Sequence, residues 1–514
     1  MAEQTVIEPA SATRPAIIRV APSDNVAVAL EALEPGRAVT IGDVTVAARA
    51  TVPPGHKIAL RAIAQGEPVV KYGFPIGTAT EAIAPGDWVH SHNLATALTD
   101  SSDFRYAPNA APHAAPNAAA PASVPTFMGY RRSTGRVGTR NEVWIINTVG
   151  CVNHAAERIA RMAGDRFAGK IDGVYAFAHP YGCSQLGDDL RNTQRVLAGL
   201  LRHPNAGGVL VLGLGCENNQ MSALLKVAGD LDRSRLRFFN TQDVVNEIDR
   251  GIDAVGELVE RMQSDRREEC SISELVLGHK CGGSDGFSGI SANAVVGRVA
   301  DRVTAMGGGV ILTEVPEMFG AEQVLLDRAA SEDVYRDTVA MVNDFKQYFV
   351  KHDQPVYENP SPGNKEGGLT TLEEKSLGAI QKGGTATVEH VLRYGEPVHG
   401  GGLSLLEAPG NDGVSSTAMV ASGATILLFT TGRGTPLGFP VPTIKISSNS
   451  DIAARKPHWI DFNAGALLDG TATMEKLADD LLALVLDVAS GRAQTNNEKY
   501  GYREIAIWKA GVTL

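Results

Sequence analysis

Brief apolar runs fill the N-terminal part of the chain, and turn signals separate them. The runs are IIRV, AVTI, VTVAAR, KIAL, VVKYG and WVHSH, with Pro-Gly pairs at Pro35-Gly36, Pro54-Gly55 and Pro85-Gly86. Pro-Gly favours tight turns because proline presets φ and glycine accepts positive φ. We therefore predict a small all-β domain over residues 16–98.

From residue 127 onward, continuous apolar runs alternate with amphipathic stretches. The runs VWIINTV, VYAFAH, VLVLGLG, LVLGH, GVILTE and ATILLFTT are typical of parallel strands buried on both faces. From Met474 to Gly491, leucine and valine recur at helical spacing, and Thr473 is the predicted N-cap. This alternation predicts an α/β, Rossmann-like region with parallel sheets.

The length of the chain, 514 residues, exceeds what one core supports, since single cores stop growing near ~250–300 residues. We expect a first α/β domain over residues 127–268 and a C-terminal α/β catalytic domain over 269–514, with the seam in the charged run near Arg266–Glu269. Residues 99–126 are the predicted linker, in which recurring proline breaks the alanine-rich sequence, so we expect a mobile tether.

Charge and cysteine content narrow the function classes. The formal net charge of −11 argues against nucleic-acid binding, which depends on clustered lysine and arginine. No apolar run reaches the ~18 residues of a membrane span, and the N-terminus shows no signal peptide. Five cysteines, an odd and sparse set, favour reduced thiols in the cytoplasm over a disulfide framework.

Four of the five cysteines directly follow apolar runs: Cys151, Cys183, Cys216 and Cys281. Ligands of open α/β sheets bind beyond the carboxyl ends of the strands, and a thiolate followed by a helix N-terminus can bind metal. One such cysteine would be interpreted as a small buried hydrophobe. Four in the same position, beside His179, Glu217 and Asp285, favour metal binding by some of them. Cys270 follows a charged run and is expected to be structural.

Glycine-rich loops are the second chemical signal. CGGSDGFSG brings backbone N–H groups close to an anion, and TTGRGTP adds Arg433, whose planar guanidinium suits a carboxylate. Each loop could also be only a tight connection. Gly213-x-Gly215-x-x-Asn218 lacks the third glycine of the dinucleotide fingerprint, which disfavours nicotinamide binding. The substrate-binding candidates are Gly282, Gly283, Ser284, Asp285, Asn359, Ser361, Asn364, Thr431 and Thr435.

Many of these stretches, in this order, resemble the altronate/galactarate dehydratase family in its fused form. They include GHK, KYGFPIG, TVGCVN, YGCSQLGDD, GLGCENNQ, CGGSDGFSGISAN, ENPSPGNKEGG and TTGRGTP. The N-terminal block resembles the family's SAF (β-clip) domain, and the remainder its catalytic region. TEVPEMFGAEQ, NDFKQYF and HWIDF are similar to the altronate branch, whereas Leu437 departs from the tyrosine that usually follows the proline of GRGTP.

The resemblance implies dehydration of D-altronate to 2-dehydro-3-deoxy-D-gluconate in hexuronate catabolism. It also implies dependence on Fe(II), with Mn(II) as a substitute, and a cytoplasmic homodimer. Two other substrates of the same family, galactarate and sulfolactate, stay open. So does a different class of protein, a non-catalytic sugar-acid-binding protein, and a structural protein with closed four-ligand zinc coordination.

Roles for the candidate residues are predicted as follows. Metal ligands are Cys183, Cys216 and Cys281, with His179 or His56 as additions, and three thiolates with an open position would also suit an iron–sulfur cluster. Arg433 and the CGGSD loop hold the substrate carboxylate. Lys365 or His56 is the base that removes the C2 proton. His56 and Lys57 are either ordinary surface residues of the β domain or groups that reach into a shared cleft.

Overall fold

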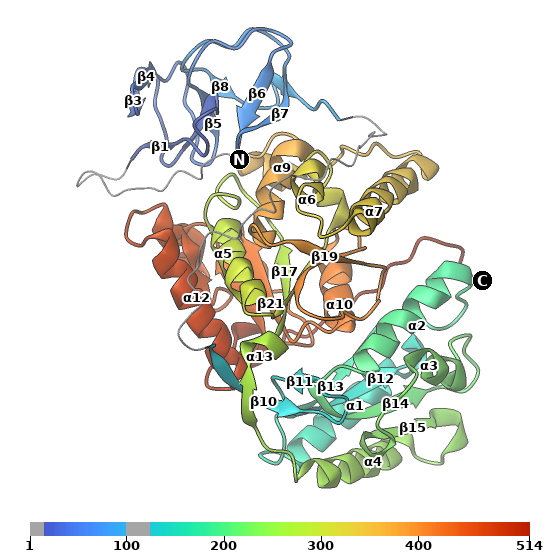
Figure 1. Ribbon diagram of the computed structural model, residues 1–514. Helices are drawn as coiled ribbons and strands as arrows, with labels where there is room; N and C mark the ends of the chain where they lie inside the picture. The colour runs from blue at the N-terminus through green and yellow to red at the C-terminus, as the bar shows by residue number, and fades with distance from the viewer. Residues whose placement is uncertain (1–14, 99–123) are drawn as a thin grey trace.

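The computed structural model of the protein describes residues 15–98 and 124–514. We call its three parts the β domain (residues 15–98), the middle domain (residues 137–265) and the C-terminal domain (residues 272–514) (Figure 1). Most of the predicted linker, residues 99–123, lies outside the described residues. Over the two described ranges, no helix is both long enough and apolar enough to cross a membrane.

The β domain is antiparallel throughout, as the alternating runs predict. Its strands form three small sheets, β1-β2-β5-β8, β3-β4 and β6-β7-β9. The glycines of all three Pro-Gly pairs have positive φ, between 82° and 88°, as tight turns require. The strands are β1 (Ile17–Ile18), β2 (Val26–Ala29), β3 (Ala38–Ile41), β4 (Val44–Ala47), β5 (Lys57–Ala59), β6 (Pro68–Lys71), β7 (Phe74–Ala79), β8 (Trp88–Val89) and β9 (Leu94–Ala95).

The middle domain is a four-stranded parallel sheet with helices on both faces. Its strand order is β13-β12-β14-β15. Val143 and Ile145 of β12 pack with α1 and α4, whereas the alternate residues Trp144 and Ile146 pack with α2 and α3. The elements are β12 (Glu142–Asn147), α1 (Asn153–Arg166), β13 (Gly173–Phe177), α2 (Gly187–Leu201), β14 (Ala206–Gly213), α3 (Met221–Ala228), β15 (Leu236–Asn240) and α4 (Glu247–Met262).

The C-terminal domain is built on a seven-stranded parallel sheet, in the order β19-β20-β18-β17-β21-β22-β23. The strands are β17 (Val276–Cys281), β18 (Gly309–Leu312), β19 (Val388–Leu392), β20 (Gly402–Leu406), β21 (Ile426–Thr431), β22 (Thr443–Ser447) and β23 (Phe462–Asn463). The helices are α5 (Ala292–Ala305), α6 (Glu322–Leu326), α7 (Glu332–Lys351), α8 (Pro362–Glu366), α9 (Leu372–Ala379), α10 (Asp412–Ser422), α11 (Ser450–Arg455), α12 (Met474–Ala489) and α13 (Asn496–Tyr500). The all-β plus parallel α/β prediction is confirmed.

Helix α12 forms where the sequence predicts it. The Thr473 side chain accepts a hydrogen bond from the Lys476 N–H at its start, and Gly491 just beyond its end has a φ of 71°. Its apolar positions Leu477, Leu481 and Val485 are buried against α5. The amphipathic pattern therefore fixed both the helix and the face that it buries.

The charged run at the predicted seam is not an open connection. Residues Glu268–Ser271 form strand β16, which pairs with β10 (Thr126–Arg131), and β10 also pairs with β11 (Val137–Gly138). Arg131 forms ion pairs with Glu268 and Glu274 across this small sheet, and Cys270 is buried in it. The run thus ties the start of the middle domain to the start of the C-terminal domain.

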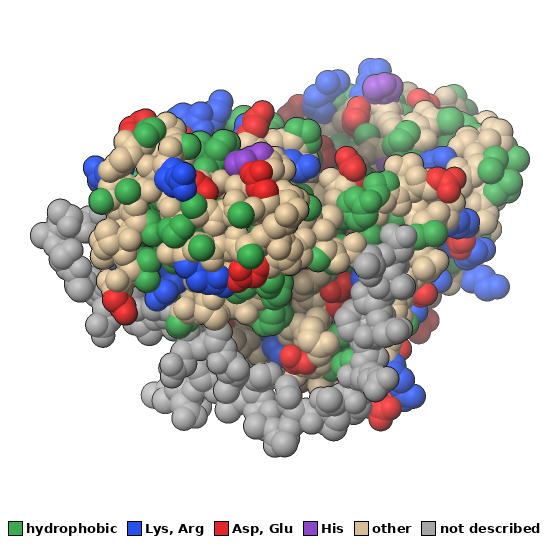
Figure 2. Space-filling model, turned by 90° about the horizontal axis from the view of Figure 1, so that it is seen from above, with side chains coloured by type: hydrophobic (Ala, Val, Ile, Leu, Met, Phe, Trp, Pro, Cys, Tyr) green, Lys and Arg blue, Asp and Glu red, His purple; other side chains and the backbone are tan. Residues whose placement is uncertain are grey.

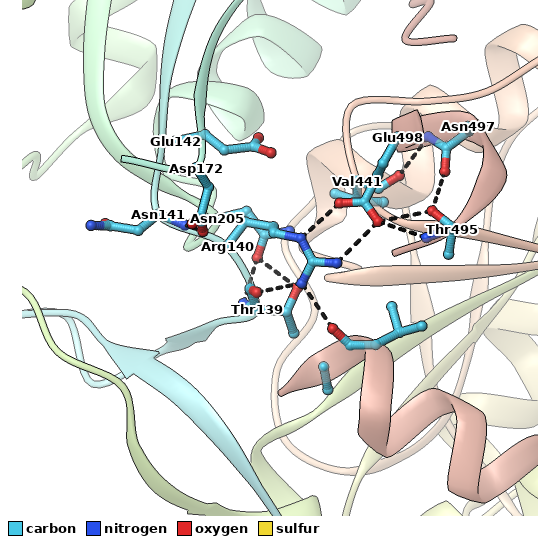
Figure 3. A network of polar contacts seen from close by, with 12 residues as sticks. Thr139, Arg140, Asn141, Glu142, Asp172, Asn205, Val441, Thr495, Asn497 and Glu498 are labelled. Carbon is cyan, nitrogen blue, oxygen red and sulfur yellow. Dashed lines mark hydrogen bonds and ion pairs between the residues drawn. The ribbon is translucent and has the colours of Figure 1, made fainter. Parts of the chain in front are cut away.

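The middle and C-terminal domains share a core and a buried ion pair. Helix α10 packs on α2, and one hydrophobic cluster includes residues of both sheets. At the edge of this contact, the Arg140 guanidinium lies 2.7 and 3.0 Å from the two carboxylate oxygens of Glu498, and it donates to the Val488 carbonyl (Figure 3). Both charged side chains are almost fully buried, so the two domains are fixed relative to each other.

The β domain covers only the C-terminal domain, and it sits over the region of α9 (Figure 1). Its turn at Gly55 packs against the backbone of Gly286 and Gly368, where an added Cβ would lie 2.0 and 2.2 Å from the Gly55 carbonyl oxygen. The β domain can approach the C-terminal domain this closely only because residues 286 and 368 are both glycine.

Seen from the β domain side, acidic and basic side chains are interspersed over the surface (Figure 2).

Candidate active site

The carboxyl ends of β17 and β18 carry a thiol and two carboxylates that lie side by side. Cys281 ends β17, Glu314 follows β18, and Glu317 ends the 3₁₀ turn Val315–Glu317. The Cys281 Sγ lies 3.4 Å from Glu317 Oε2 and 3.8 Å from Glu314 Oε2. One ligand atom from each of these buried residues lies within 4.8 Å of the others. We call the three residues the acid–thiol group.

Lysines contact the acid–thiol group from two sides. Lys382 Nζ lies 2.7 Å from Cys281 Sγ and 3.2 Å from Glu314 Oε2. Lys280 contacts the other oxygen of Glu314, and its Nζ lies 2.8 Å from Asp412 Oδ1. Both lysine side chains are almost completely buried. Buried ammonium groups need such partners, because the desolvation of an isolated charge is too costly.

A third lysine joins the acid–thiol group to two glycine-rich loops. Lys375 Nζ lies 2.9 Å from Glu317 Oε1, 2.8 Å from Asn359 Oδ1 and 3.2 Å from Asn364 Oδ1. The Asn364 amide in turn donates to the Ser284 carbonyl, at 2.8 Å. The ENPSPGNK and CGGSD segments, which are far apart in the sequence, therefore meet beside the acid–thiol group.

The electrostatics of this cluster keep the thiol protonated. Burial, reinforced by the Glu314 carboxylate, raises the pKa of Cys281 to about 12. Burial alone would raise the pKa of Glu317, but Lys375 and the other lysines outweigh it and lower that pKa to about 2. Three ammonium groups thus face three carboxylates, of Glu314, Glu317 and Asp412. The cluster is charge-balanced when Cys281 is neutral.

The donor types of the acid–thiol group fit a divalent transition metal. One sulfur and two carboxylates are ligands that such metals accept, and Glu314 is held at a left-handed φ of 72°, a conformation that costs energy in a non-glycine residue. Metal binding here requires Cys281 to lose its proton and Lys382 to leave the sulfur, so it is coupled to proton release. The group is a possible buried metal site.

The Asp285 carboxylate is held by hydrogen bonds from neighbouring side chains. Ser448 Oγ donates to its carboxylate at 2.9 Å, as do Ser288 Oγ at 2.8 Å and Asn449 Nδ2 at 2.9 Å. Burial raises its pKa. A Cβ at Gly432 would lie 2.2 Å from the Asp285 carboxyl carbon, so glycine is needed there. Asp285 therefore joins the CGGSD loop to the ends of β21 and β22.

The TTGRGTP loop brings Arg433 over α8. Arg433 is half-exposed, and its guanidinium donates to the Gly363 carbonyl at 3.1 Å and lies 3.2 Å from the exposed Glu366 carboxylate. The Thr431 and Thr435 hydroxyls accept backbone N–H groups of their own loop. Ser361 caps α8 and exchanges hydrogen bonds with Asn364. The predicted substrate-binding residues thus gather at one end of the sheet, where many of them stabilise the loops.

The β domain contributes His56 and Lys57 to this region. Lys57 Nζ, fully buried, donates to the Gly368 carbonyl, the Thr370 hydroxyl and the Glu374 carboxylate, at 2.8–2.9 Å. Lys71 Nζ lies 2.9 Å from the other oxygen of Glu374. We call Lys57, Lys71 and Glu374 the interface triad, because it joins the β domain to α9 of the C-terminal domain.

The interface triad perturbs the titration of its members. Burial lowers the pKa of Lys57 to about 8, although Glu374 opposes the shift. Burial also opposes the charge of Lys71, but Glu374 outweighs it, and the pKa of Lys71 is raised. Burial would raise the pKa of Glu374, but the two lysines outweigh it and lower that pKa to about 2. Lys57 is therefore the lysine of the triad that loses its proton first.

His56 lies next to the triad with both ring nitrogens engaged. Trp88 Nε1 donates to Nδ1 at 3.2 Å, which makes Nε2 the protonated nitrogen, 3.1 Å from the Glu366 carbonyl. Burial lowers the pKa of His56, so the ring is neutral. Lys365, on α8, lies in the adjacent turn, where its backbone N–H bonds to the Ser361 carbonyl.

The predicted metal ligands are divided between two domains. Cys281 is buried in the C-terminal domain, whereas Cys183 and Cys216 are exposed in the middle domain. Among the described residues, the acid–thiol group is the one set of three or more potential ligands that meets within 4.8 Å. Both ring nitrogens of His179 bond to backbone, at Tyr181 N and Asn147 O. This arrangement leaves His179 no free nitrogen and does not bring the three cysteines together.

Several residues of the site carry only weak sequence signals. Lys280 interrupts an apolar run, which is unusual because lysine is rarely buried without a partner. Glu314 and Glu317 follow a predicted strand, in the position where ligands bind, but no spacing links them to Cys281. Lys382 and Glu374 have no local signal, since both lie in short helical segments. Only the fold places them at the site.

The chain matches three family models that together span most of its length. These are "Altronate/galactarate dehydratase SAF domain" at residues 15–97, "D-galactarate dehydratase/Altronate hydrolase, second domain" at 129–263, and "D-galactarate/Altronate dehydratase, C-terminal" at 272–513. The three matched ranges correspond to the three domains described above.

Full-length relatives give the same picture. The chain is 52% identical to the altronate dehydratase of Escherichia coli (strain K12) and 48% identical to that of Bacillus subtilis (strain 168), over 97% of this chain and 99% of each relative. It is 33% identical to the galactarate dehydratase (L-threo-forming) of Escherichia coli (strain K12), over 89% of this chain and 90% of the relative.

Proposed function

The chain belongs to the altronate/galactarate dehydratase family, and we propose that it is a hydro-lyase that converts D-altronate to 2-dehydro-3-deoxy-D-gluconate and water. The observation that carries the proposal is the meeting of four distant segments, 281–285, 314–317, 359–366 and 431–435, at one end of one sheet beneath His56 and Lys57. The altronate branch is supported by identity of about half over nearly the whole length.

The reaction removes a proton from C2 and a hydroxyl group from C3. The electrons of the C2–H bond form the C2=C3 double bond, and the hydroxyl leaves as water after it takes up a proton. The resulting enol then becomes the 2-keto product by moving the proton of the C2 hydroxyl to C3. Removing the C2 proton places negative charge on the carboxylate, so the site must stabilise that charge.

Arg433 and the CGGSD loop are the groups that we assign to the substrate carboxylate. The guanidinium of Arg433 is half-exposed and pairs with a solvent-exposed Glu366, so an incoming carboxylate competes with a weak partner. The loop residues 282–285 lie next to it, since Arg433 N and Gly432 N both donate to the Gly283 carbonyl. A planar guanidinium binds a carboxylate through two hydrogen bonds.

His56 and Lys365 are the proposed bases, and Lys57 assists. His56 is neutral because burial lowers its pKa, and a neutral imidazole can take a proton at Nδ1 once that nitrogen gives up its hydrogen bond from Trp88. Lys57 contacts the adjacent Gly368 carbonyl, and its pKa of about 8 allows it to exchange a proton near neutral pH. Lys365, on α8, is the alternative candidate for the base. Comparing the pH–rate profiles of His56→Asn and Lys365→Met separates the two, because only loss of the base removes the fall in rate at low pH.

We also propose dependence on Fe(II), with Mn(II) as a substitute. Cys281, Glu314 and Glu317 would hold the ion, and as a Lewis acid it would stabilise negative charge on the substrate carboxylate. Without a metal, the ammonium groups of Lys280 and Lys382 neutralise the acid–thiol group. When an ion binds, these two ammonium groups would have to move away from the ligand atoms. The proposal further includes a homodimer in the cytoplasm with a role in hexuronate catabolism. Sedimentation of the purified protein tests the dimer.

An anaerobic assay with D-altronate tests the function. Purified protein is supplied with Fe(II), Mn(II) or a chelator, and the 2-keto product is followed. Metal-dependent product supports the proposal. Turnover of galactarate or sulfolactate, without turnover of D-altronate, would support a lyase but show that D-altronate is not its substrate. If none of the three reacts while D-altronate still binds, the protein is a sugar-acid-binding protein and the hydro-lyase proposal fails.

A further inference from the structure

Three free, exposed cysteines lie at the carboxyl ends of adjacent strands in the middle domain, away from the acid–thiol group. Cys183 follows β13, Cys151 follows β12 and Cys216 follows β14. These strands are neighbours in the sheet, with β12 between the other two. Parallel strands end at the same edge and lie ~4.8 Å apart. The topology therefore gathers the three thiols on one edge of the sheet.

Direct contacts hold the three cysteine loops together. Gly150 N donates to the Tyr181 carbonyl at 2.8 Å, which joins the Cys151 and Cys183 loops. Asn219 N donates to the Gly182 carbonyl at 3.0 Å, and Ser184 N donates to Asn218 Oδ1 at 2.8 Å, which joins the Cys183 and Cys216 loops. Each cysteine therefore lies within two residues of a hydrogen bond to a neighbouring loop.

Buried polar side chains fix the shape of these loops. The Glu217 carboxylate accepts the Thr148 hydroxyl and the N–H groups of Leu214 and Gly215. The Asn219 amide donates to the Thr148 carbonyl, at 2.9 Å. Ser184, next to Cys183, is held at a φ of 56°, a left-handed conformation that is uncommon outside glycine. The polar side chains thus determine a rigid frame, while the thiols themselves stay exposed.

The helices that follow the three loops all begin without a side-chain cap. The N-cap residues of α1, α2 and α3 are Val152, Leu186 and Gln220, and none of them accepts a hydrogen bond from the first turn through its side chain. By contrast, α4, α7, α10 and α12 are capped by a side chain. Helix N-termini without a side-chain cap present backbone N–H groups and the positive end of the helix dipole, and this favours anionic ligands at the edge.

We propose that Cys151, Cys183 and Cys216 hold an iron–sulfur cluster of the [4Fe–4S] type, with one iron left open. Three sulfurs around one tetrahedral ion, with metal–sulfur bonds of ~2.3 Å, would lie only ~3.8 Å apart. The three thiols do not all fall within 4.8 Å of one another. A cluster binds each thiolate through a different iron and so spans a wider triangle. The exposed face leaves the fourth iron accessible to a small anionic or hydroxyl ligand.

The test measures the cluster itself, independently of altronate turnover. The full-length protein is isolated or reconstituted without oxygen, and iron and acid-labile sulfide are counted together with the visible absorption and Mössbauer spectra. We expect about four sulfide per chain, and about four iron in addition to any ion that the acid–thiol group holds. Cys151→Ser, Cys183→Ser and Cys216→Ser are each expected to lower the sulfide count at least tenfold and to remove the iron that accompanies the sulfide. Cys270→Ser, the matched control in β16, is expected to keep them.

Two further measurements keep the inference open to refutation. Circular dichroism and thermal melting show whether each variant is folded, and maleimide labelling of the unmutated protein reports which thiols the cluster protects. Protection of these three cysteines that disappears on chelation supports the cluster. Iron without sulfide, counts that survive the three substitutions, or equal labelling with and without iron overturns it. Loss of both counts in Cys281→Ser alone would move the cluster to the acid–thiol group and would also overturn it.

Discussion

The two parallel sheets of this protein end differently, although both place chemistry beyond the carboxyl ends of their strands. The sheet of the C-terminal domain ends in a buried cluster in which three lysines face three carboxylates. The sheet of the middle domain ends in three exposed thiols. The β domain covers the first edge and not the second (Figure 1). Topology therefore decides where reactive groups gather, while the cover decides whether they are charged, paired or open to solvent.

The cover also explains why the two edges use different residues. Beneath the β domain, a charged group must have a partner because water is excluded, so the site consists of ion pairs. At the open edge, water solvates polar atoms, so exposed thiols need no charged partner. The comparison predicts that disturbing the cover will have larger effects than disturbing the open edge.

Removing the charge of Glu374 should weaken the contact between the β domain and α9. In Glu374→Gln, the ammonium groups of Lys57 and Lys71 lose their shared buried carboxylate, and we expect a loss of ~3–5 kcal/mol in the free energy of unfolding. Urea denaturation measures it. Glu475→Gln is the control, since its carboxylate is 66% exposed beside Arg302 and should cost no more than ~1 kcal/mol. Equal costs for the two variants would contradict the role of burial.

As the pH falls, the contact between the β domain and the C-terminal domain should lose stability before the exposed edge of the middle domain does. The folded pKa of Glu374 is about 2, below its usual 4.5, so the unfolded state binds the proton more readily. Its stabilisation is therefore present above pH 4.5 and is lost as the pH falls towards 2. This amounts to about 3 kcal/mol. Urea midpoints between pH 5 and pH 3 measure the loss, and the curve of Glu374→Gln should be flatter. Parallel curves for the two proteins would refute this assignment.

Arg433→Lys tests whether Arg433, which lies between the buried cluster and solvent, binds the substrate carboxylate. Lysine keeps the charge but cannot form the paired hydrogen bonds of a guanidinium. We expect kcat/KM for D-altronate to fall ~10–100-fold, about 1.4–2.7 kcal/mol of transition-state stabilisation. Arg455→Lys on α11, whose partner is the exposed Asp451, is the matched control. An unchanged kcat/KM in Arg433→Lys would remove this residue from carboxylate binding.

The smallest effect concerns the uncapped helices of the open edge. Leu186, half-exposed at the N-cap of α2, has the extended backbone that a capping residue needs, with φ −132° and ψ 165°. In metal-free protein, Leu186→Ser should stabilise the fold by ~0.5–1 kcal/mol because serine would accept a first-turn N–H. Thr473→Ala, which removes the existing cap of α12, should cost a similar amount. Thermal melting compares the two. A destabilised Leu186→Ser would show that the first turn is already satisfied.

Sequence patterns determined much of the secondary structure and the class of fold. Period-two runs and Pro-Gly pairs predicted the β domain, and continuous apolar runs predicted β12, β13, β14, β17, β18 and β21. These signals are local, since they depend on turn geometry and on which faces of an element are buried. The prediction passed over β19, β20 and β22, because their short apolar runs lie among glycine, proline and polar segments that obscure the period.

The sequence also identified which segments carry chemistry, because glycine-rich loops and cysteines after strands are visible without a fold. It did not determine which of them meet. The pairing of β17 with β18, the next strand along the chain, brings Cys281 and Glu314 together. The pairing of β17 with β21 places the TTGRGTP loop beside them from a distant part of the sequence. The separate middle sheet instead places Cys183 and Cys216 with Cys151. Strand order, and the choice of the edge that the β domain covers, depend on long-range packing, and local patterns do not encode it.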